Sequence, residues 1–417
     1  MKKILLIMPY FYPHKGGSQK YAEELYTHLL QGNPCEFQVD VLCYNTDQAP
    51  SKEKYRGMRI YRIPCWQIIS GRFTLPKPWY LIKALYSFSK NHYDFINTHL
   101  TFFDPTWWGW IYAKLIGARS IFTEHVASFP VHQNKLVQSI SKLACKTIGR
   151  FSLAFYDLIT VTNKQAGKFL ENEIGVKNEI NLIYGGVDTN FFSPRTGKKK
   201  RIIPVIRKEF KKNDVLITYV GRLIWTKGVE QLYHAIKLIE ALLPSNVYFI
   251  LAGGGELENK LRKSIGQDEL SERVFLTGPI EYNQVRDLLK ASDIFINPSH
   301  HNEGFPNTVL EAGACENLVI ATDNGGTSEI IKNKKTGLLI SQKDTEALAK
   351  ILLWAVKNHE KGISFAKNLR KVLKEKYDWR LISNQLVRFL NQTEVSTEKR
   401  INFNQPLFIK GNSKTTY

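Results

Sequence analysis

Two carboxylates bracket the segment EGFPNTVLE, in which Glu303 and Glu311 lie eight residues apart. The segment follows an apolar run that is predicted to be a strand. Pro306 suits the first position of a helix, because proline lacks the N–H group that would be unpaired there. We therefore expect Glu303 in the loop before a helix and Glu311 in its second turn.

The start of this predicted helix carries groups that an anion needs. The N–H groups of Asn307, Thr308 and Val309 have no partner within the helix and point back toward the loop. Helix N–H groups can hold phosphate and carboxylates accept hydrogen bonds from sugar hydroxyls, so the combination suits a nucleotide-sugar. The alternative is structural: one Glu favoured by the helix dipole and a second on the solvated face.

Composition and charge limit the classes of protein to consider. The 417 residues are enough for about two or three domains. A net charge of +20 implies an anionic partner, which is nucleic acid, an acidic membrane surface or a phosphorylated substrate. No recognition-helix or stacking motif supports nucleic acid, so we expect none.

The cysteines and the amino-terminal segment indicate the compartment. The five cysteines are scattered without a C-x-x-C pair, which argues against a disulfide framework or zinc site and for a reducing compartment. The start MKKILLIMPYFYPHKGG mimics a signal peptide, but Pro9 and Pro13 interrupt it and no small-residue cleavage site follows. A buried first strand explains it better. No apolar run of about 18 residues exists, so we expect a cytoplasmic protein without a membrane span.

Strand and helix patterns alternate almost throughout. Short apolar runs predict strands buried on both faces at 4–8, 39–43, 95–98 and 158–162, and helical periodicity fills gaps such as 19–30 and 133–147. A second series of predicted strands comprises 215–220, 247–252, 274–277, 293–297, 318–321 and 337–340. The alternation predicts an α/β fold with two Rossmann-like parallel-sheet domains.

The domain boundaries follow from these patterns. We expect a first domain at 1–194, a basic linker at 195–213, a second domain at 214–378, a carboxy-terminal helix at 379–392 that crosses back to the first domain, and a polar tail at 393–417.

Each half opens with a strand, a glycine-containing loop and a helix. Gly16 and Gly17 precede a predicted helix and would let a phosphate approach the backbone, although a simple tight turn is the alternative. In the second half, Arg222 follows a strand and Lys227 precedes a helix. A forked donor and a point charge suit a diphosphate, although surface cations are common in loops.

Together these segments resemble the retaining glycosyltransferases of family 4, also called glycosyltransferase group 1, which have the GT-B fold. The likeness extends to about Asn391 and rests on INLIYGGVDTNFFSP, YVGRLIWTKGVEQL, ILAGGGEL, VFLTGPI, DIFINPS, EGFPNTVLEAGA and VIATDNGGTSEII. The resemblance implies two domains that face each other across a cleft. The family usually has Asn where Gly185 stands, in a turn expected outside the ligand shell.

The resemblance also implies roles for individual residues. The catalytic set would be Glu303, which binds donor-sugar hydroxyls, His125 beside the reacting sugar, and Arg222 with Lys227 as the diphosphate clamp. The donor-binding set would be Gly16, Gly17, Phe305, Asn307, Thr308, Val309 and the ribose-binding Glu311. No D-x-D element occurs, which fits catalysis without a metal ion, and no cofactor is expected.

The resulting prediction is a retaining, metal-independent glycosyltransferase in cell-surface polysaccharide or glycolipid synthesis. It would transfer a sugar from a nucleoside-diphosphate-sugar to a glycan or lipid-linked acceptor. A GT-B phosphorylase or epimerase, and a non-catalytic sugar-nucleotide-binding protein, remain alternatives.

Basic and aromatic residues of the first half favour an anionic membrane surface as a further partner, at the inner face of the membrane. The basic residues concerned are Lys135, Lys142, Lys146 and Arg150, around an apolar stripe. The alternative is that the nearby tryptophans are interior residues and the lysines a solvated face.

Overall fold

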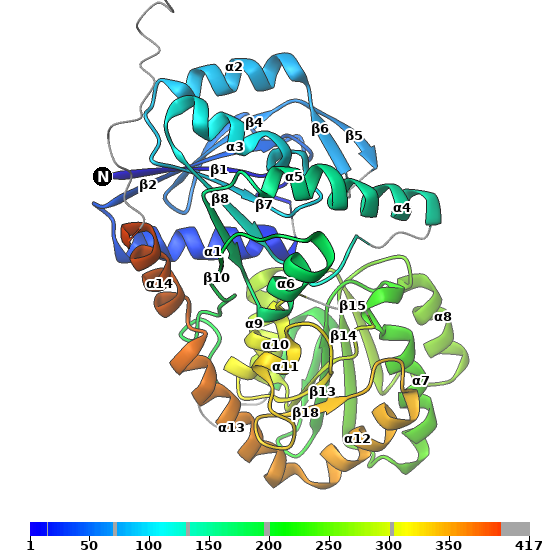
Figure 1. Ribbon diagram of the computed structural model, residues 1–417. Coiled ribbons are helices and arrows are strands. Elements are labelled where there is room, and N and C mark those ends of the chain that lie inside the picture. Colours follow the sequence, from blue (N-terminus) through cyan, green and yellow to red (C-terminus); the bar gives the residue numbers. More distant parts are fainter. Residues whose placement is uncertain (15, 70–72, 131–133, 196–200, 301–303, 393–417) are drawn as a thin grey trace, which may run out of the picture.

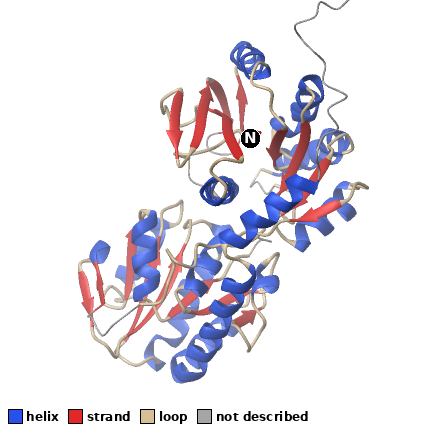
Figure 2. Cartoon of the chain, turned by 90° about the vertical axis from the view of Figure 1, so that its left-hand side faces the viewer, coloured by secondary structure: helices blue, strands red, loops and turns tan. Residues whose placement is uncertain are grey.

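Two α/β domains form the chain, in agreement with the expected fold class (Figures 1 and 2). The structure is a computed structural model that describes residues 1–14, 16–69, 73–130, 134–195, 201–300 and 304–392. Within these residues no helix is both long and apolar enough to cross a membrane.

The first domain is built on an eight-stranded sheet in the order β10-β9-β8-β7-β1-β2-β4-β3. Neighbouring strands are parallel, except that β3 runs antiparallel to β4. The central strands β1, β7 and β8 are buried along almost their whole length, with apolar residues in β1 and buried polar residues toward the ends of β7 and β8. The strands are β1 (Lys2–Ile7), β2 (Phe37–Tyr44), β3 (Lys52–Tyr55), β4 (Met58–Ile63), β7 (Phe95–His99), β8 (Arg119–Glu124), β9 (Leu158–Val161) and β10 (Ile180–Leu182).

Helices cover both faces of this sheet, and a small antiparallel pair lies beside it. The pair is β5 (Cys65–Ile69) with β6 (Phe73–Pro76). The helices are α1 (Gly17–Gly32), α2 (Pro78–Ser89), α3 (Asp104–Ile116), α4 (Lys135–Ala144), α5 (Arg150–Leu153) and α6 (Lys164–Phe169). A π-helical turn, Cys145–Gly149, joins α4 to α5 and makes them one continuous helix, longer than the expected 133–147.

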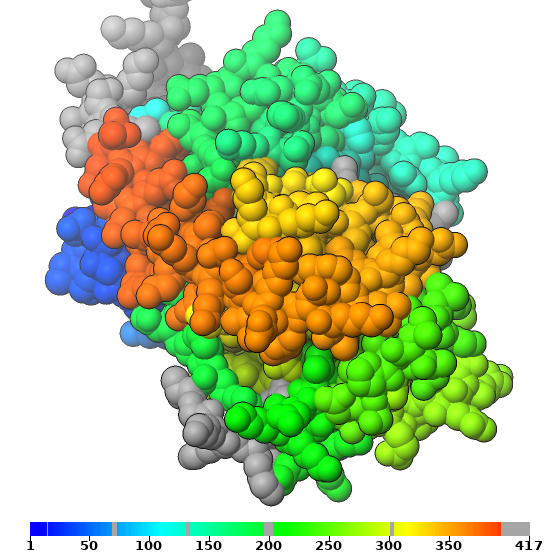
Figure 3. All heavy atoms as spheres, turned by 90° about the horizontal axis from the view of Figure 1, so that it is seen from below, coloured from blue at the N-terminus to red at the C-terminus, as the bar shows by residue number. Residues whose placement is uncertain are grey.

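The second domain has a six-stranded parallel sheet in the order β15-β14-β13-β16-β17-β18. The strands are β13 (Val215–Val220), β14 (Val247–Ala252), β15 (Val274–Gly278), β16 (Ile294–Asn297), β17 (Leu318–Thr322) and β18 (Leu338–Ile340), close to the expected ranges. The helices are α7 (Val229–Ile239), α8 (Glu258–Gln267), α9 (Tyr282–Ala291), α10 (Asn307–Ala314), α11 (Thr327–Ile330), α12 (Thr345–Lys357) and α13 (His359–Lys376). Figure 3 shows α12 and α13 (orange) across the lower face of the molecule.

The last described helix, α14 (Trp379–Gln392), packs on α1 of the first domain. Its apolar residues recur at helical spacing and are buried in the core of that domain: Trp379, Ile382, Leu386 and Leu390. Figure 1 shows α13 rising from the second domain and α14 lying beside α1. The chain therefore crosses between the domains twice.

The segment between the domains differs from the expected linker. Part of 195–213 forms an antiparallel pair, β11 (Arg201–Ile203) with β12 (Lys208–Phe210). Ile203 and Phe210 are buried against the second domain, so these apolar side chains tie the basic segment to that domain. The expected tail at 393–417 lies outside the described residues.

Candidate functional site

The two domains enclose a cleft of about 1180 Å³, lined by the ends of strands from both sheets. In parallel sheets, ligands bind beyond the carboxyl ends of the strands, so the cleft lies where this fold places a site. The sequence-predicted residues among its lining are Gly16, Gly17, His125, Arg222, Lys227, Phe305, Asn307, Thr308 and Glu311.

The loop after β13 brings two cations to the cleft. Arg222 is exposed just beyond the strand, and Lys227 ends a short 3₁₀ turn, Trp225–Lys227. Gly228 follows with a φ of +69°, and a Cβ there would lie 1.9 Å from the carbonyl oxygen of Pro298. Only glycine can make this turn, which holds the Lys227 backbone against the end of β16.

The amino end of α10 forms another part of the wall. Its helical residues begin at Asn307, one position later than expected, because Pro306 has an extended backbone at the N-cap. Asn307 and Thr308 line the cleft. Val309 does not: its side chain is buried in the core, and its N–H donates to the Pro306 carbonyl at 3.1 Å. The expectation that Val309 contacts the donor is therefore not supported by the structure, while Glu303 lies outside the described residues.

Glu311 is buried at the base of the cleft and accepts a hydrogen bond of 3.2 Å from the hydroxyl of Tyr282. Burial raises the pKa of the Glu311 carboxyl to about 7, against the opposing effects of the Lys20 charge and the Tyr282 hydroxyl. The carboxyl therefore changes its charge near neutral pH when the cleft holds no ligand.

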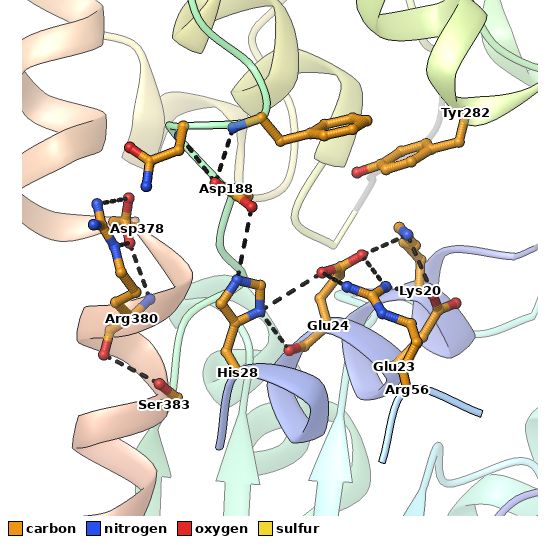
Figure 4. Close-up of polar contacts among 12 residues, drawn as sticks. Lys20, Glu23, Glu24, His28, Arg56, Asp188, Tyr282, Asp378, Arg380 and Ser383 are labelled. Carbon is orange, nitrogen blue, oxygen red and sulfur yellow. Dashed lines mark hydrogen bonds and ion pairs between the residues drawn. The ribbon is translucent and has the colours of Figure 1, made fainter. Parts of the chain in front are cut away.

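A charged cluster on α1 faces Tyr282 from the first domain (Figure 4). The ammonium of Lys20 lies 3.8 Å from the centre of the Tyr282 ring and 2.5 Å from Oε1 of Glu24. Arg56 reaches the same carboxylate, with Nη1 at 2.7 Å from Oε1. These residues join the two domains across the cleft through a cation over an aromatic ring.

His125 directly follows β8 and is buried beside the cleft. Its backbone N–H donates to Glu124 at 2.9 Å, and its ring lies edge-on to Tyr21. A Cβ on Gly304 would lie 1.6 Å from the His125 carbonyl oxygen, so the loop before α10 meets His125 closely. Burial lowers the pKa of His125 to about 3, so the ring is neutral at physiological pH.

Two glycines that the sequence analysis discussed, Gly16 and Gly185, line the cleft. Gly16 is the N-cap of α1, and its loop lines the cleft together with Gly17. Gly185 also lines the cleft, where its Cα faces the ring of Phe305. The sequence had suggested that this turn lies outside the ligand shell. The structure instead places the turn in the cleft wall, where a Cβ added at Gly185 would lie 2.6 Å from the Phe305 ring.

Sequence reasoning did not identify Lys20, Tyr282 or His99 as site residues. His99 ends β7, the strand paired with β8, and its Nδ1 lies 2.7 Å from Nε2 of His125. The signal available was that polar residues end both strands, and parallel neighbours bring their carboxyl ends together. Within the described part of the chain, no group of three or more His, Cys, Asp or Glu residues is placed to hold a metal ion.

Two protein-family profiles match the chain. Residues 15–191 match Glycosyltransferase Family 4, and residues 203–372 match Glycosyl transferases group 1. A UDP-Gal:α-D-GlcNAc-diphosphoundecaprenol α-1,3-galactosyltransferase of Escherichia coli is 30% identical over 76% of this chain and 80% of its own length.

Solved structures share the fold. Sucrose-phosphate synthase from Thermosynechococcus elongatus is 21% identical with a TM-score of 0.77, over 94% of this chain and 99% of its own. HepE of Anabaena, in complex with UDP and glucose, is 18% identical with a TM-score of 0.72, over 94% of this chain and all of its own (100%). Both likenesses show the two-domain GT-B architecture.

Proposed function

Because the chain belongs to the family 4 glycosyltransferases of group 1, we propose that it transfers a sugar from a nucleoside-diphosphate-sugar to a glycan or lipid-linked acceptor, with retention at the anomeric carbon and without a metal ion. The observation that carries the proposal is the convergence of unlike groups on one cleft. Arg222, Lys227 and the amino end of α10 offer positive charge and N–H donors, while Glu311 offers a carboxylate. This combination matches a ligand that has both a diphosphate and a ribose.

Each group has a role in the proposed reaction. Arg222 and Lys227 hold the diphosphate and stabilise the charge that develops as it leaves. Glu311 accepts hydrogen bonds from the ribose hydroxyls, and Glu303 takes those of the donor sugar. The roles of Arg222, Lys227 and Glu311 rest on the family resemblance together with the cleft geometry, and that of Glu303 rests on the resemblance alone.

The proposed sugar transfer proceeds without a covalent intermediate on the enzyme. The bond between the anomeric carbon and the diphosphate oxygen breaks, and the acceptor hydroxyl oxygen bonds to the same face of that carbon. The acceptor proton passes to the departing phosphate oxygen, so the products are the glycoside and the nucleoside diphosphate.

A lipid-linked acceptor is supported by the walls of the cleft and by one relative. The first-domain side of the cleft carries a group of aromatic rings, which are Phe73, Phe102, Phe103, Phe129 and Phe169. The relative in Escherichia coli acts, by its name, on a sugar joined to diphosphoundecaprenol. Apolar walls beside a polar centre suit an acceptor with an apolar portion.

An anionic membrane surface at the cytoplasmic face is part of the proposal. On α4, Leu136, Ile140 and Leu143 are 68%, 58% and 63% exposed and lie on one face of the helix, at i, i+4 and i+7. Exposed apolar side chains among cations are typical of interfacial helices. In Figure 1, α4 extends from the right side of the first domain.

Some of the tryptophans of the first domain are exposed, as membrane contact requires, and others are partly buried. Trp66 and Trp79 are exposed on β5 and α2. Trp107, Trp108 and Trp110 of α3 are partly buried, and each indole N–H donates to a protein oxygen. Only the first pair is therefore available to a membrane.

The test is a donor screen. The purified protein is incubated with a panel of nucleotide-sugars that vary in base and sugar, and release of the nucleoside diphosphate is measured with and without a polyprenyl-diphosphate-sugar acceptor. We expect slow hydrolysis of one donor and faster release with a suitable acceptor. Absence of both binding and turnover across the panel would refute the proposal.

A further inference from the structure

A chain of buried hydrogen bonds runs from the core of the first domain to His125. It begins at Asn97 on β7, whose amide Nδ2 lies 3.1 Å from the carbonyl oxygen of Ile121 and 3.1 Å from Oγ1 of Thr123. A backbone carbonyl can only accept, so the amide nitrogen must face it. Oδ1 of Asn97 therefore points the other way, where it accepts from the hydroxyl of Tyr26 at 2.7 Å.

The same Oδ1 fixes the proton of His99. Nε2 of His99 lies 2.8 Å from Oδ1 of Asn97, and this oxygen has no proton to give. Nε2 of His99 must therefore carry the hydrogen. Burial keeps the pKa of His99 well below its usual value, so the ring is neutral and its Nδ1 is a bare acceptor.

The next hydrogen bond of this chain joins His99 to His125. Its Nε2 lies 2.7 Å from Nδ1 of His99, so Nε2 of His125 must donate. A neutral ring that is protonated at Nε2 has a lone pair at Nδ1. Among the described residues no hydrogen bond to Nδ1 of His125 is present, and the residue lines the cleft.

We propose that His99 is a positioning residue that holds His125 in the Nε2–H form, so that Nδ1 of His125 accepts a hydrogen bond from a sugar hydroxyl in the cleft. The inference rests on the proposed function and on the family resemblance, which implies that the donor sugar lies beside His125. It also deepens that function, because a bare lone pair binds a hydroxyl but repels a phosphate or carboxylate oxygen. The diphosphate is thereby directed to Arg222 and Lys227, and the sugar to His125.

The tautomer can be measured directly in the wild-type protein. Two-bond ¹H–¹⁵N correlation spectra of histidine-labelled protein distinguish Nε2–H from Nδ1–H rings, and a spectrum of His125→Gln assigns the His125 signals. We expect His125 in the Nε2–H form at pH 7. An Nδ1–H ring, or a doubly protonated one, would overturn the proposal. This measurement needs no turnover, so it stands apart from the test of the proposed function.

Two variants of His99 separate positioning from packing. His99→Asn keeps an acceptor, Oδ1, near the place of Nδ1, while His99→Phe keeps the ring volume without any nitrogen. We expect His99→Phe to lower kcat by about 10- to 100-fold, by analogy with the loss of the partner that orients a metal-bound histidine. Its affinity for the nucleoside diphosphate should be unchanged, and His99→Asn should recover most of the loss. Equal kcat for wild type and a folded His99→Phe protein, or equal losses in both variants, would contradict the proposal.

The ligand side of the inference has its own readout. Each sugar hydroxyl of the donor is replaced by hydrogen in turn. One of these deoxy donors should lose at least about 10-fold in kcat/KM, because Nδ1 of His125 then has no hydroxyl to accept a hydrogen bond from. That penalty should disappear in His125→Ala. If every deoxy donor shows the same penalty in wild type and His125→Ala, Nδ1 of His125 does not bind a sugar hydroxyl.

Discussion

The hydroxyl of Tyr282 donates a 3.2 Å hydrogen bond to Glu311, from the first residue of α9 to the middle of α10. The Tyr282 ring also stacks on Phe191 and lies beneath the Lys20 ammonium. One side chain therefore contacts the carboxylate proposed to bind ribose and a cation of the opposite domain. This relationship gives Tyr282 a role that the sequence did not suggest.

Tyr282→Phe should weaken nucleotide binding while it keeps the stacked ring. Loss of the hydroxyl removes a donor to the charged form of Glu311, so the pKa of Glu311 should rise above about 7. At pH 7 we expect the nucleoside diphosphate to bind about 3- to 10-fold more weakly, which corresponds to about 1 kcal/mol. Titration calorimetry measures this.

A matched control is Tyr233→Phe, since the Tyr233 hydroxyl also donates to a carboxylate, that of Asp268, away from the cleft. Its affinity should equal that of wild type. If both variants bind alike, the Tyr282 hydroxyl has no influence on the site.

Glu311→Gln should stabilise the unliganded protein at high pH. The folded-state pKa of about 7 exceeds the usual value of 4.5, so the folded protein keeps a proton that the unfolded chain loses between these values. The free energy of unfolding then falls as pH rises through this window, by about 3 kcal/mol in total. We expect the variant to raise Tm at pH 8 but not at pH 4.5, and to bind nucleoside diphosphate more weakly. A Tm difference independent of pH would show that the Glu311 carboxyl does not titrate in this window.

Arg222→Ala and Lys227→Ala should each weaken binding of the nucleoside diphosphate itself. Hydrogen bonds to charged groups contribute about 1.5–3 kcal/mol, so we expect losses of roughly 10-fold or more. Lys211→Ala removes an exposed cation away from the cleft and serves as the control. Equal affinities for all three variants would refute the diphosphate clamp.

Glu303→Gln tests a residue whose role comes from the sequence alone. A neutral amide accepts hydrogen bonds from sugar hydroxyls less well than a carboxylate. We expect turnover to fall by about 10²-fold, as on removal of one preorganised transition-state contact, with little change in nucleoside diphosphate affinity. Turnover near that of wild type in a folded variant would exclude Glu303 from the site.

Local patterns predicted most of the fold and part of the site. β13 and β14 have the predicted bounds, because buried apolar runs between loops leave few alternatives. Arg222, Lys227 and Glu311 were also predicted, since each belongs to a contiguous motif beside a predicted strand or helix.

The remaining features depend on contacts between distant segments. Lys20 and Tyr282 meet across two domains, and neither lies in a motif that indicates the other. The N–H of Val309 is not available as the sequence suggested, because it donates to the Pro306 carbonyl three residues back, a 3₁₀-type bond that tightens the first turn of α10. Ile203 and Phe210 lie among lysines and arginines, so their burial could not be inferred from composition.

The exposed face of α4 should bind anionic vesicles, and its charge and apolar parts can be tested separately. Each Lys or Arg near an anionic surface contributes about 1 kcal/mol, screened over a Debye length of about 8 Å at physiological ionic strength. We expect co-sedimentation with phosphatidylserine vesicles that weakens in high salt. It should fall sharply when four basic residues become Gln: Lys135, Lys142, Lys146 and Arg150.

Two further variants distinguish this helix from general positive charge. The same change at four exposed lysines of α12 and α13 should leave vesicle binding nearly intact; these are Lys350, Lys361, Lys367 and Lys371. Replacement of Leu136, Ile140 and Leu143 by Ser should weaken binding even at low salt, because insertion of the apolar face is lost. If both lysine sets have equal effects, binding depends on net charge alone. If the serine variant binds like wild type, α4 does not insert, and its apolar face requires another partner.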